Sequence, residues 1–314
     1  MQPPVRIGAR ASLLSQTQSR WVQRRVAAAL GAPPEAAEEV APLVLITTTG
    51  DRVQDRRLLE IGGKQLFTKE IEEALLDGRV DLAVHSMKDV PAEQPPGLAI
   101  AAVPEREDPR DAFVSRRWKT LRDLPQGARL GTASLRRQAQ ALAARPDLEI
   151  ALLRGNVDTR LRKLDAGEYD AILLAASGLN RLGLSGEIGS FLDPVAAPPA
   201  PGQGALAVQS RIEDAGADFL RALNHAETAV TVAAERGALA ALEGSCRTAM
   251  GAHATVEGST LKLVVEALTP DGRTRWRREG QTSLNVTEPL AEARTLGAVL
   301  AEQIRLEAGD RLEV

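Results

Sequence analysis

Apolar positions in the first part of the chain alternate between short runs and helical spacing. A short run at residues 5–8 is followed by a helical pattern from about Ser12 to Leu30 and by a second run at 43–47. Thr68 is a suitable N-cap for a helix that ends near Leu76, and the run 81–85 comes next. This repeated order of strand and helix predicts an α/β domain with a largely parallel sheet.

The same pattern recurs between two crossings that are rich in proline. The charged stretch 103–109 is typical of a linker, and the proline cluster 194–204 leads into an apolar strand at 205–208. Between them, the runs 148–153 and 171–174 predict buried strands of a second α/β unit. Two crossings indicate that the chain leaves the first domain and returns to it.

After about residue 223 the pattern changes to a helix followed by strands. A helix is predicted at 226–242, strands around 252–255, 261–268 and 273–278, and a last helix at 288–307, with tight-turn residues at 269–272. This is the pattern of a small α+β domain. We therefore predict three domains, formed by residues 1–103 with 200–222, by 104–199 and by 223–314.

Composition and charge narrow the class of protein. In 314 residues, 39 Lys and Arg against 42 Asp and Glu give a net charge of -3, and only 3% of residues are aromatic. A protein with neither a basic field nor stacking aromatics is not expected to bind nucleic acid. The N-terminus has no apolar signal region and no run could span a membrane, so we expect a cytoplasmic protein without membrane partners. Three scattered histidines and one cysteine predict no metal site and no internal disulfide.

Arginines follow two predicted strands, a short one that ends near Leu130 and the one at 148–153, at positions where a helix begins. Ser134 is placed to cap a helix whose first turn contains Arg136 and Arg137, and Arg154 follows the next strand. Cations are unfavourable at the positive end of a helix dipole unless an anion is near. The junctions therefore predict an anionic ligand such as a carboxylate or phosphate, with solvated surface arginines as the alternative.

Polar residues also follow the strands of the first domain. Arg10 and Ser12 come after the first strand, and Lys88 and Asp89 come after the strand that ends at His85. Since ligands of open α/β sheets bind beyond the carboxyl ends of the strands, we expect the polar residues of both domains to meet across one cleft. An aspartate in such a cleft could stabilise a developing cation, although most Lys-Asp pairs are solvated surface.

Two other segments have candidate chemistry. Cys246 lies between a helix end and a strand, where Gly244 and Ser245 suggest an exposed loop and Arg247 favours a thiolate. The alternative is a small buried hydrophobe, which is the commoner role of a lone cysteine. The glycine-containing segment 62–65 lacks the spacing and the Ser or Thr of a Walker A phosphate loop, so that interpretation is rejected.

Taken together, these motifs resemble the porphobilinogen deaminase family of tetrapyrrole biosynthesis, also called hydroxymethylbilane synthases. The resemblance covers nearly the whole chain. The matching stretches are 6–12, 62–70, 84–91, 131–137, 153–160, 201–206 and 243–251.

The resemblance implies a fold and a reaction. Two α/β domains built like periplasmic binding proteins would flank a cleft, and a small α+β domain would carry Cys246. That cysteine would hold a dipyrromethane cofactor through a thioether. Four porphobilinogen molecules would be deaminated and joined head to tail on it, and water would then release hydroxymethylbilane. We expect a monomer whose partner is this small substrate.

The resemblance also implies roles for individual residues. Asp89 matches the catalytic acid that stabilises cationic pyrrole nitrogens. The residues that match cofactor contacts are Lys88, Ser134, Arg136, Arg137 and Arg160, with Cys246 as the point of attachment. The residues that match substrate contacts are Arg10, Ser12, Phe67, Thr132, Arg154 and Gln203. The acetate and propionate of each pyrrole would explain why arginines predominate.

Some positions depart from the family pattern, and two alternatives stay open. Ala9, Gln65 and Ala133 replace the usual threonine, glycine and serine, and Ser245 and Ala249 flank the cysteine where glycine and proline are common. The charged loop 49–66 is a candidate lid. The alternatives are a binding protein or sensor that holds a carboxylated ligand without chemistry, and an inactive deaminase. The presence of Asp89 and Cys246 argues against the second alternative.

Overall fold

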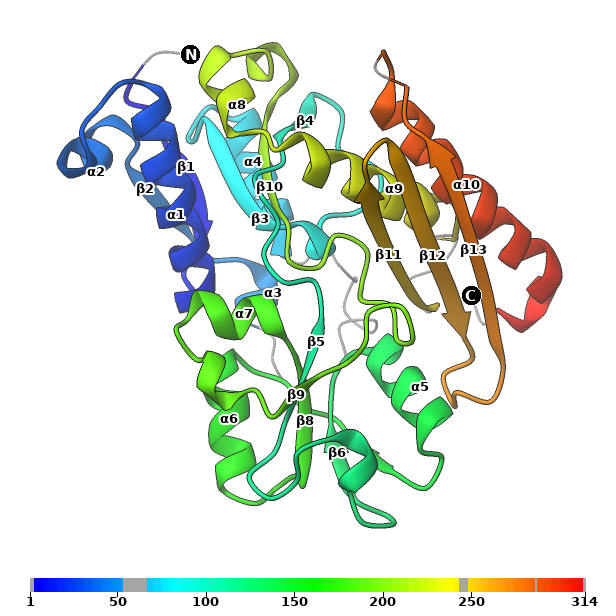
Figure 1. Ribbon diagram of the computed structural model, residues 1–314. Coiled ribbons are helices and arrows are strands. Elements are labelled where there is room, and N and C mark those ends of the chain that lie inside the picture. The colour runs from blue at the N-terminus through cyan, green and yellow to red at the C-terminus, as the bar shows by residue number, and fades with distance from the viewer. Residues whose placement is uncertain (1–2, 53–66, 243–247, 286, 313–314) are drawn as a thin grey trace. The chain divides into compact units, whose positions relative to one another are not determined.

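The computed structural model describes residues 3–52, 67–242, 248–285 and 287–312 (Figure 1). The chain divides into two units, one formed by Met1–Glu107 with Ala205–Ala229 and the other by Asp108–Gly204 with Val230–Val314. The first division falls inside the predicted crossing 103–109, and the second falls at the end of the proline cluster. The finer division into three domains stays a prediction.

The first unit is built on a five-stranded mixed sheet with the order β2-β1-β3-β10-β4. Its strands are β1 (Ile7–Arg10), β2 (Leu43–Ile46), β3 (Leu82–Ser86), β4 (Leu98–Ala102) and β10 (Leu206–Arg211). Its helices are α1 (Leu13–Ala29), α2 (Ala37–Val40), α3 (Thr49–Arg52), α4 (Lys69–Leu76) and α8 (Asp218–Leu223). Strand β1 is parallel to β2 and β3, whereas β10 is antiparallel to β3 and β4. The pairing of β10 confirms that the chain returns to the first sheet.

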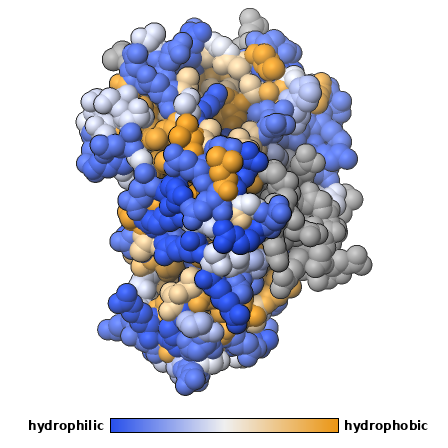
Figure 2. Space-filling view, turned by 90° about the vertical axis from the view of Figure 1, so that its right-hand side faces the viewer, coloured by the Kyte–Doolittle hydropathy of each residue, from blue (hydrophilic) through white to orange (hydrophobic). Residues whose placement is uncertain are grey.

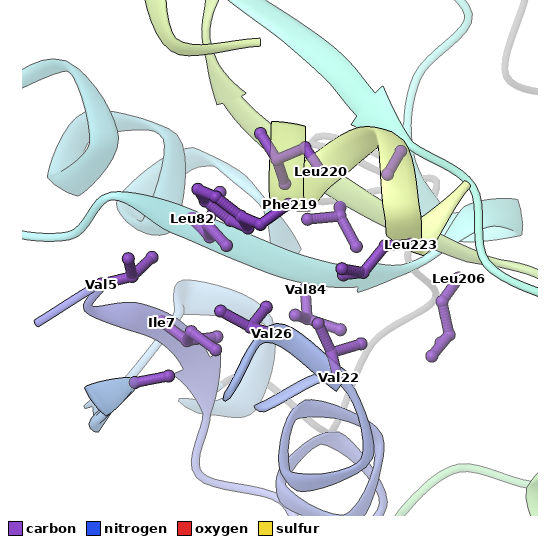
Figure 3. Close-up of a cluster of buried hydrophobic side chains, with 13 residues drawn as sticks. Val5, Ile7, Val22, Val26, Leu82, Val84, Leu206, Phe219, Leu220 and Leu223 are labelled. Atoms are coloured by element: carbon purple, nitrogen blue, oxygen red, sulfur yellow. The ribbon is translucent and has the colours of Figure 1, made fainter. Parts of the chain in front are cut away.

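Apolar side chains on one face of this sheet form a core with helices α1 and α8. Figure 3 shows Val22 and Val26 of α1, Leu220 of α8 and Val84 of β3 converging on this core. Val26 and Leu220 are fully buried. Burial of such side chains stabilises by about 1.5–3 kcal/mol each, which fixes the sheet from which the polar residues project.

The second unit contains a five-stranded sheet of equivalent order, β7-β6-β8-β5-β9. Its strands are β5 (Asp111–Val114), β6 (Arg129–Gly131), β7 (Glu149–Ala151), β8 (Ala171–Ala175) and β9 (Ser190–Phe191). Its helices are α5 (Leu135–Ala144), α6 (Val157–Asp165) and α7 (Ala176–Arg181). Strand β6 is parallel to β7 and β8, and β5 is antiparallel to β8 and β9. The predicted repeat of the α/β pattern is confirmed.

The C-terminal part forms a separate antiparallel sheet of three strands. Its elements are α9 (Ala226–Leu242), β11 (Ala249–Glu257), β12 (Thr260–Leu268), β13 (Arg275–Ser283) and α10 (Pro289–Ala308). Helix α10 lies along β13 (Figure 1). The turn between β12 and β13 contains Gly272 with φ +71°, as the tight-turn residues predicted. The fold class, two α/β sheets with a small α+β part, is confirmed.

Helix α5 packs against the C-terminal sheet, which explains why both belong to one unit. Ala139 of α5 is buried with Ala249 and Leu268. A Cβ atom on Gly272 would lie 2.5 Å from the carbonyl oxygen of Ala139, so the turn can approach the helix only with glycine at this position.

Several predicted boundaries differ from the structure. Strand β13 continues to Ser283, five residues beyond its predicted end, because its polar half pairs with β12 as far as Thr260. Strands β4, β5 and β9 have no counterpart in the sequence prediction. In the predicted lid loop 49–66, the first four residues form α3, and residues 53–66 lie outside the described residues.

The face of the molecule in Figure 2 is mainly hydrophilic, with groups of hydrophobic residues between hydrophilic ones. Helix α10 nevertheless exposes Leu290, Val299 and Leu306. In the described ranges, every helix is too short or too polar to cross a membrane.

Candidate functional site

In the first unit, the predicted polar residues lie at the carboxyl edge of two paired parallel strands. Arg10 is the last residue of β1, and Ser12 caps α1 by accepting a hydrogen bond from the backbone N–H of Ser15. Lys88 and Asp89 lie in the single 3-10 turn that follows β3, and both are half-buried. Because β1 and β3 are neighbours, the fold brings these four residues to one edge, as the sequence predicted.

Phe67 joins this edge through an aromatic contact. The guanidinium carbon of Arg10 lies 4.3 Å from the centre of the Phe67 ring, a cation–π geometry. Phe67 is half-buried and directly precedes Thr68 and helix α4. An arginine held against an aromatic ring can bind a carboxylate while the ring contacts a flat apolar ligand.

A buried polar network underlies this edge and was not predicted from the sequence. His85 Nε2 lies 3.1 Å from the side-chain oxygen of Gln209, and the amide nitrogen of Gln209 donates to Gln94 and Glu72 at 3.0 and 3.3 Å. Burial raises the pKa of the Glu72 carboxyl. Burial lowers the pKa of His85 to about 4, assisted by Arg10 and opposed by the hydrogen bond to Gln209 and the charge of Asp89. His85 is therefore neutral near pH 7.

This neutral histidine predicts a specific loss of stability in acid. Between about pH 6.5 and pH 4 the unfolded chain binds a proton at residue 85 that the folded chain does not, so the free energy of unfolding falls as the pH falls. The maximum loss from this group is about 3 kcal/mol. Urea unfolding near pH 7 and near pH 5 should show a smaller acid loss in His85→Gln than in the unaltered protein. An unchanged loss in His85→Gln would contradict the assignment.

In the second unit, the two arginine-containing junctions follow adjacent parallel strands. Strand β6 pairs with β7, and beyond them the N–H of Thr132 donates to Ala151 while the N–H of Leu153 donates to Thr132. The Thr132 hydroxyl accepts a hydrogen bond from the N–H of Ser134 at 3.1 Å, and Ser134 caps α5. The N-cap prediction is confirmed, and the two junctions lie side by side.

Arg136 and Arg137 are buried and share one internal carboxylate. Arg136 Nη1 donates to Asp111 Oδ2 at 2.6 Å, and Arg137 donates to Asp111 Oδ1 through Nε at 2.9 Å and Nη2 at 2.8 Å. Both arginine side chains are at most 7% exposed, and the carboxylate of Asp111 is not exposed at all. Burial opposes ionisation of Asp111, but the charges of Arg136 and Arg137 outweigh it and hold its pKa well below the usual range.

The position of Asp111 corrects part of the prediction that was based on the helix dipole. The sequence predicted that an external anion balances the arginines of the first turn, and the structure shows that a protein carboxylate already balances one of them. Asp111 reaches them because β5 is antiparallel to β8, which puts the first residue of β5 beside Ala175, the last residue of β8. The available signal in the sequence was an aspartate directly before the apolar run 112–114.

Gln203 belongs to the same cluster. Its amide nitrogen donates to Asp111 Oδ1 at 2.9 Å and to the carbonyl of Pro109 at 2.7 Å, and its oxygen accepts a hydrogen bond from Arg137 at 3.3 Å. Gln203 is 1% exposed. Its hydrogen bonds thus hold the cluster together, beside any contact with substrate.

Arg154 and Arg160 lie at the second junction, where α6 begins. Nη1 of Arg154 is buried and has no hydrogen-bond partner within the described part of the chain. Arg160 Nε donates at 2.7 Å to the carbonyl of Gly155, whose φ of +113° lets the loop turn back toward the helix. A buried donor without a partner is costly, so Nη1 of Arg154 is a candidate donor for an anionic ligand.

The fold thus brings the predicted site residues together in two groups, one in each unit. The first consists of Arg10, Ser12, Phe67, Lys88 and Asp89, and the second of Thr132, Ser134, Arg136, Arg137, Arg154, Arg160 and Gln203. That the two groups face one cleft stays a prediction. Cys246 and Gln65 lie outside the described residues. Among the residues that are described, no group of three His, Cys, Asp or Glu side chains could hold a metal ion.

Solved structures similar to this chain include periplasmic binding proteins. A nutrient-binding protein from Burkholderia cenocepacia bound to methionine is 16% identical, covers 70% of this chain and 89% of its own, and has a TM-score of 0.43. An ABC transporter periplasmic substrate-binding protein from Coxiella burnetii is 17% identical, with the same coverage of both chains and the same TM-score.

Sequence comparisons give a much closer likeness. The family model for the porphobilinogen deaminase dipyromethane cofactor binding domain matches residues 5–218, and that for the porphobilinogen deaminase C-terminal domain matches 229–305. A porphobilinogen deaminase of Caulobacter vibrioides is 64% identical and one of Phenylobacterium zucineum 66% identical, each alignment covering 99% of this chain and 98% of the relative. The chain therefore belongs to the porphobilinogen deaminase family.

Proposed function

We propose that this enzyme joins four porphobilinogen molecules head to tail, releases one ammonia for each, and frees the linear tetrapyrrole by hydrolysis. The reaction would take place on a dipyrromethane group bound through a thioether to Cys246, the single cysteine of the chain. The observation that carries the proposal is the match of both family domains in order over nearly the whole chain.

The donors of the second unit fit the chemistry of a dipyrromethane group. Such a group carries an acetate and a propionate on each ring, and guanidinium forks bind carboxylates through paired hydrogen bonds. Arg154 would provide such a fork, whereas Arg136 and Arg137 hold Asp111 and would contribute positive charge beside it. Nε of Arg136 and Nη1 of Arg154 are buried without hydrogen-bond partners in the described structure. The hydroxyl of Ser134 and Arg160 would add further donors.

In the first unit, the proposed role of Asp89 is electrostatic. When bound, the dipyrromethane group supplies the terminal pyrrole carbon that attacks the incoming unit. Asp89, at the carboxyl edge of β3, would stabilise the positive charge that develops on a pyrrole nitrogen. Arg10 would hold a substrate carboxylate while Phe67, 4.3 Å from it, contacts the ring. Lys88 and Ser12 would contribute further donors to the carboxylates.

Substitution of Arg154 tests the contribution of fork geometry. We expect Arg154→Lys to lower kcat/KM for porphobilinogen by about 10- to 100-fold, since lysine keeps the charge but cannot form two parallel hydrogen bonds. Arg162 on α6, the helix that follows Arg154, is the matched control, because its side chain is 74% exposed and Arg162→Lys should keep kcat/KM within about twofold. Equal efficiency of both lysine variants would show that Arg154 acts through bulk charge or not at all.

The stoichiometry of the reaction tests the proposed function as a whole. Purified protein given porphobilinogen should release four ammonia molecules for each linear tetrapyrrole formed. A protein that binds porphobilinogen and releases no ammonia would support the non-catalytic binder or sensor instead. The comparisons do not favour that alternative, since the named relatives match over nearly their full length.

A further inference from the structure

We propose that Asp111 is a positioning residue that sets both the orientation and the net charge of the Arg136 and Arg137 guanidinium groups, and through them the binding of the carboxylates of the pyrrole ligand. This inference rests on the proposed function. Asp111 itself would not touch the ligand, since its carboxylate is not exposed and is surrounded by donors from the protein. It would act through the two arginines.

The geometry gives Asp111 control over both forks at once. Oδ2 accepts mainly from Arg136, while Oδ1 accepts from Arg137 and from the amide of Gln203. Arg136 and Arg137 are consecutive, so without a common anchor their long side chains would separate and repel each other. One carboxylate with donors on both oxygens holds the two guanidinium groups in a single arrangement before any ligand arrives.

The charges of this cluster do not cancel. Two guanidinium groups and one carboxylate sum to one positive charge, held where the side chains are at most 7% exposed. Full neutralisation would remove the attraction for an anion, and no neutralisation would place two adjacent cations in the interior. With Asp111 the cluster keeps one net positive charge. In the described structure, Nε of Arg136 is buried without a hydrogen-bond partner.

The other hydrogen-bond acceptors of Arg136 Nη1, the side chain of Gln140 and the carbonyl of Pro198, are neutral, so they support Arg136 without changing its charge. Gln140, one helical turn further on, accepts from Arg136 Nη1 at 2.8 Å and donates to Glu266 of β12 at 2.9 Å. Gln140 thus ties Arg136 to the C-terminal sheet without changing the charge of the fork. Of these partners of Arg136, only Asp111 should therefore alter ligand binding through its charge.

The test compares Asp111→Asn and Asp111→Glu with the unaltered protein. The readouts are the fraction of molecules carrying a two-pyrrole adduct by intact mass, and KM and kcat for porphobilinogen per loaded molecule. We expect Asp111→Asn to reduce the loaded fraction and to raise KM by about tenfold or more, with a smaller change in kcat. Asp111→Glu keeps the charge and should recover part of both losses.

Asp147 provides the matched control in the same unit, because it also forms a two-point ion pair, with Arg145 at 2.8 and 2.7 Å. Asp147→Asn should leave loading and KM within about twofold of the unaltered protein. A purely structural Asp111 would lower thermal stability in Asp111→Asn but leave loading and KM unchanged, and that result would overturn the inference. If Asp111→Asn does not fold, Asp111→Glu decides, because its additional methylene must displace both guanidinium groups: loading and KM equal to those of the unaltered protein would then overturn the proposed positioning role. Failure of the unaltered protein to release ammonia would instead refute the proposed function.

Discussion

Asp89→Asn should lower kcat by about two to four orders of magnitude, a loss of about 3–5 kcal/mol in transition-state stabilisation. Asparagine keeps the size and the hydrogen-bonding capacity of the residue but removes the charge that would stabilise cationic pyrrole nitrogens. Asp89 is half-buried in the turn after β3, so folding and porphobilinogen binding should largely survive. Asp89→Glu should retain more activity because the charge remains, although one additional methylene misplaces it.

The measurement is single-turnover ammonia release by protein whose loading has been checked by mass, so that failed cofactor assembly is not taken for failed catalysis. Asp77, an exposed aspartate of the same unit, is the control, and Asp77→Asn should react at the rate of the unaltered protein. Turnover by fully loaded Asp89→Asn within a few-fold of the unaltered rate would mean that another carboxylate performs the catalytic role.

Cys246→Ser should abolish polymerisation altogether. A thioether requires sulfur, and an alcohol is a far weaker nucleophile than a thiolate, so the dipyrromethane group could not attach. The variant should also melt at a lower temperature than the loaded protein. An anionic group bound to the folded state stabilises it, and here it would screen the repulsion among Arg136, Arg137 and Arg154.

Thermal melting and ammonia release, measured side by side on Cys246→Ser and on loaded protein, check both parts of this prediction. Equal melting temperatures would show that the anionic group contributes nothing to the folded state. Sustained turnover by Cys246→Ser would show that the growing chain is not held through this residue.

The sequence identified the parallel half of each sheet and with it most of the site. Strands β1, β3, β6 and β8 are apolar runs followed or preceded by amphipathic helices, and a βαβ order fixes which ends meet. Polar residues that follow such strands, such as Arg10 and Asp89 in the first unit and Thr132 in the second, could therefore be assigned to the carboxyl edge of their own sheet.

Three strands with antiparallel neighbours, β4, β5 and β9, were not predicted, and Asp111 was missed because it belongs to β5. Proline-rich and charged segments rather than amphipathic helices lead into β4 and β5, so no helical period marks their place, and β9 has only two residues. Which way a strand runs also decides which of its ends faces the site. In β5 the first residue, Asp111, lies at the site, because β5 runs antiparallel to β8. The sequence alone does not show this direction.

The buried network beneath the first group of site residues was missed for a different reason. His85 lies in β3 and Gln209 lies in β10, and the two residues are 124 positions apart in the sequence. The sequence indicated that the chain returns to the first sheet but not the register of that return. Only the pairing of Ala207 with His85 brings Gln209 within reach of the imidazole.

Intact mass of the purified protein before and after a limiting dose of porphobilinogen tests the central claim most directly. The account predicts a starting mass that exceeds the mass of the chain by two linked pyrroles, located on the peptide that contains Cys246. After the dose, further species should appear, each heavier by one pyrrole unit. A folded protein that binds porphobilinogen yet keeps the mass of the bare chain before and after the dose would contradict the account.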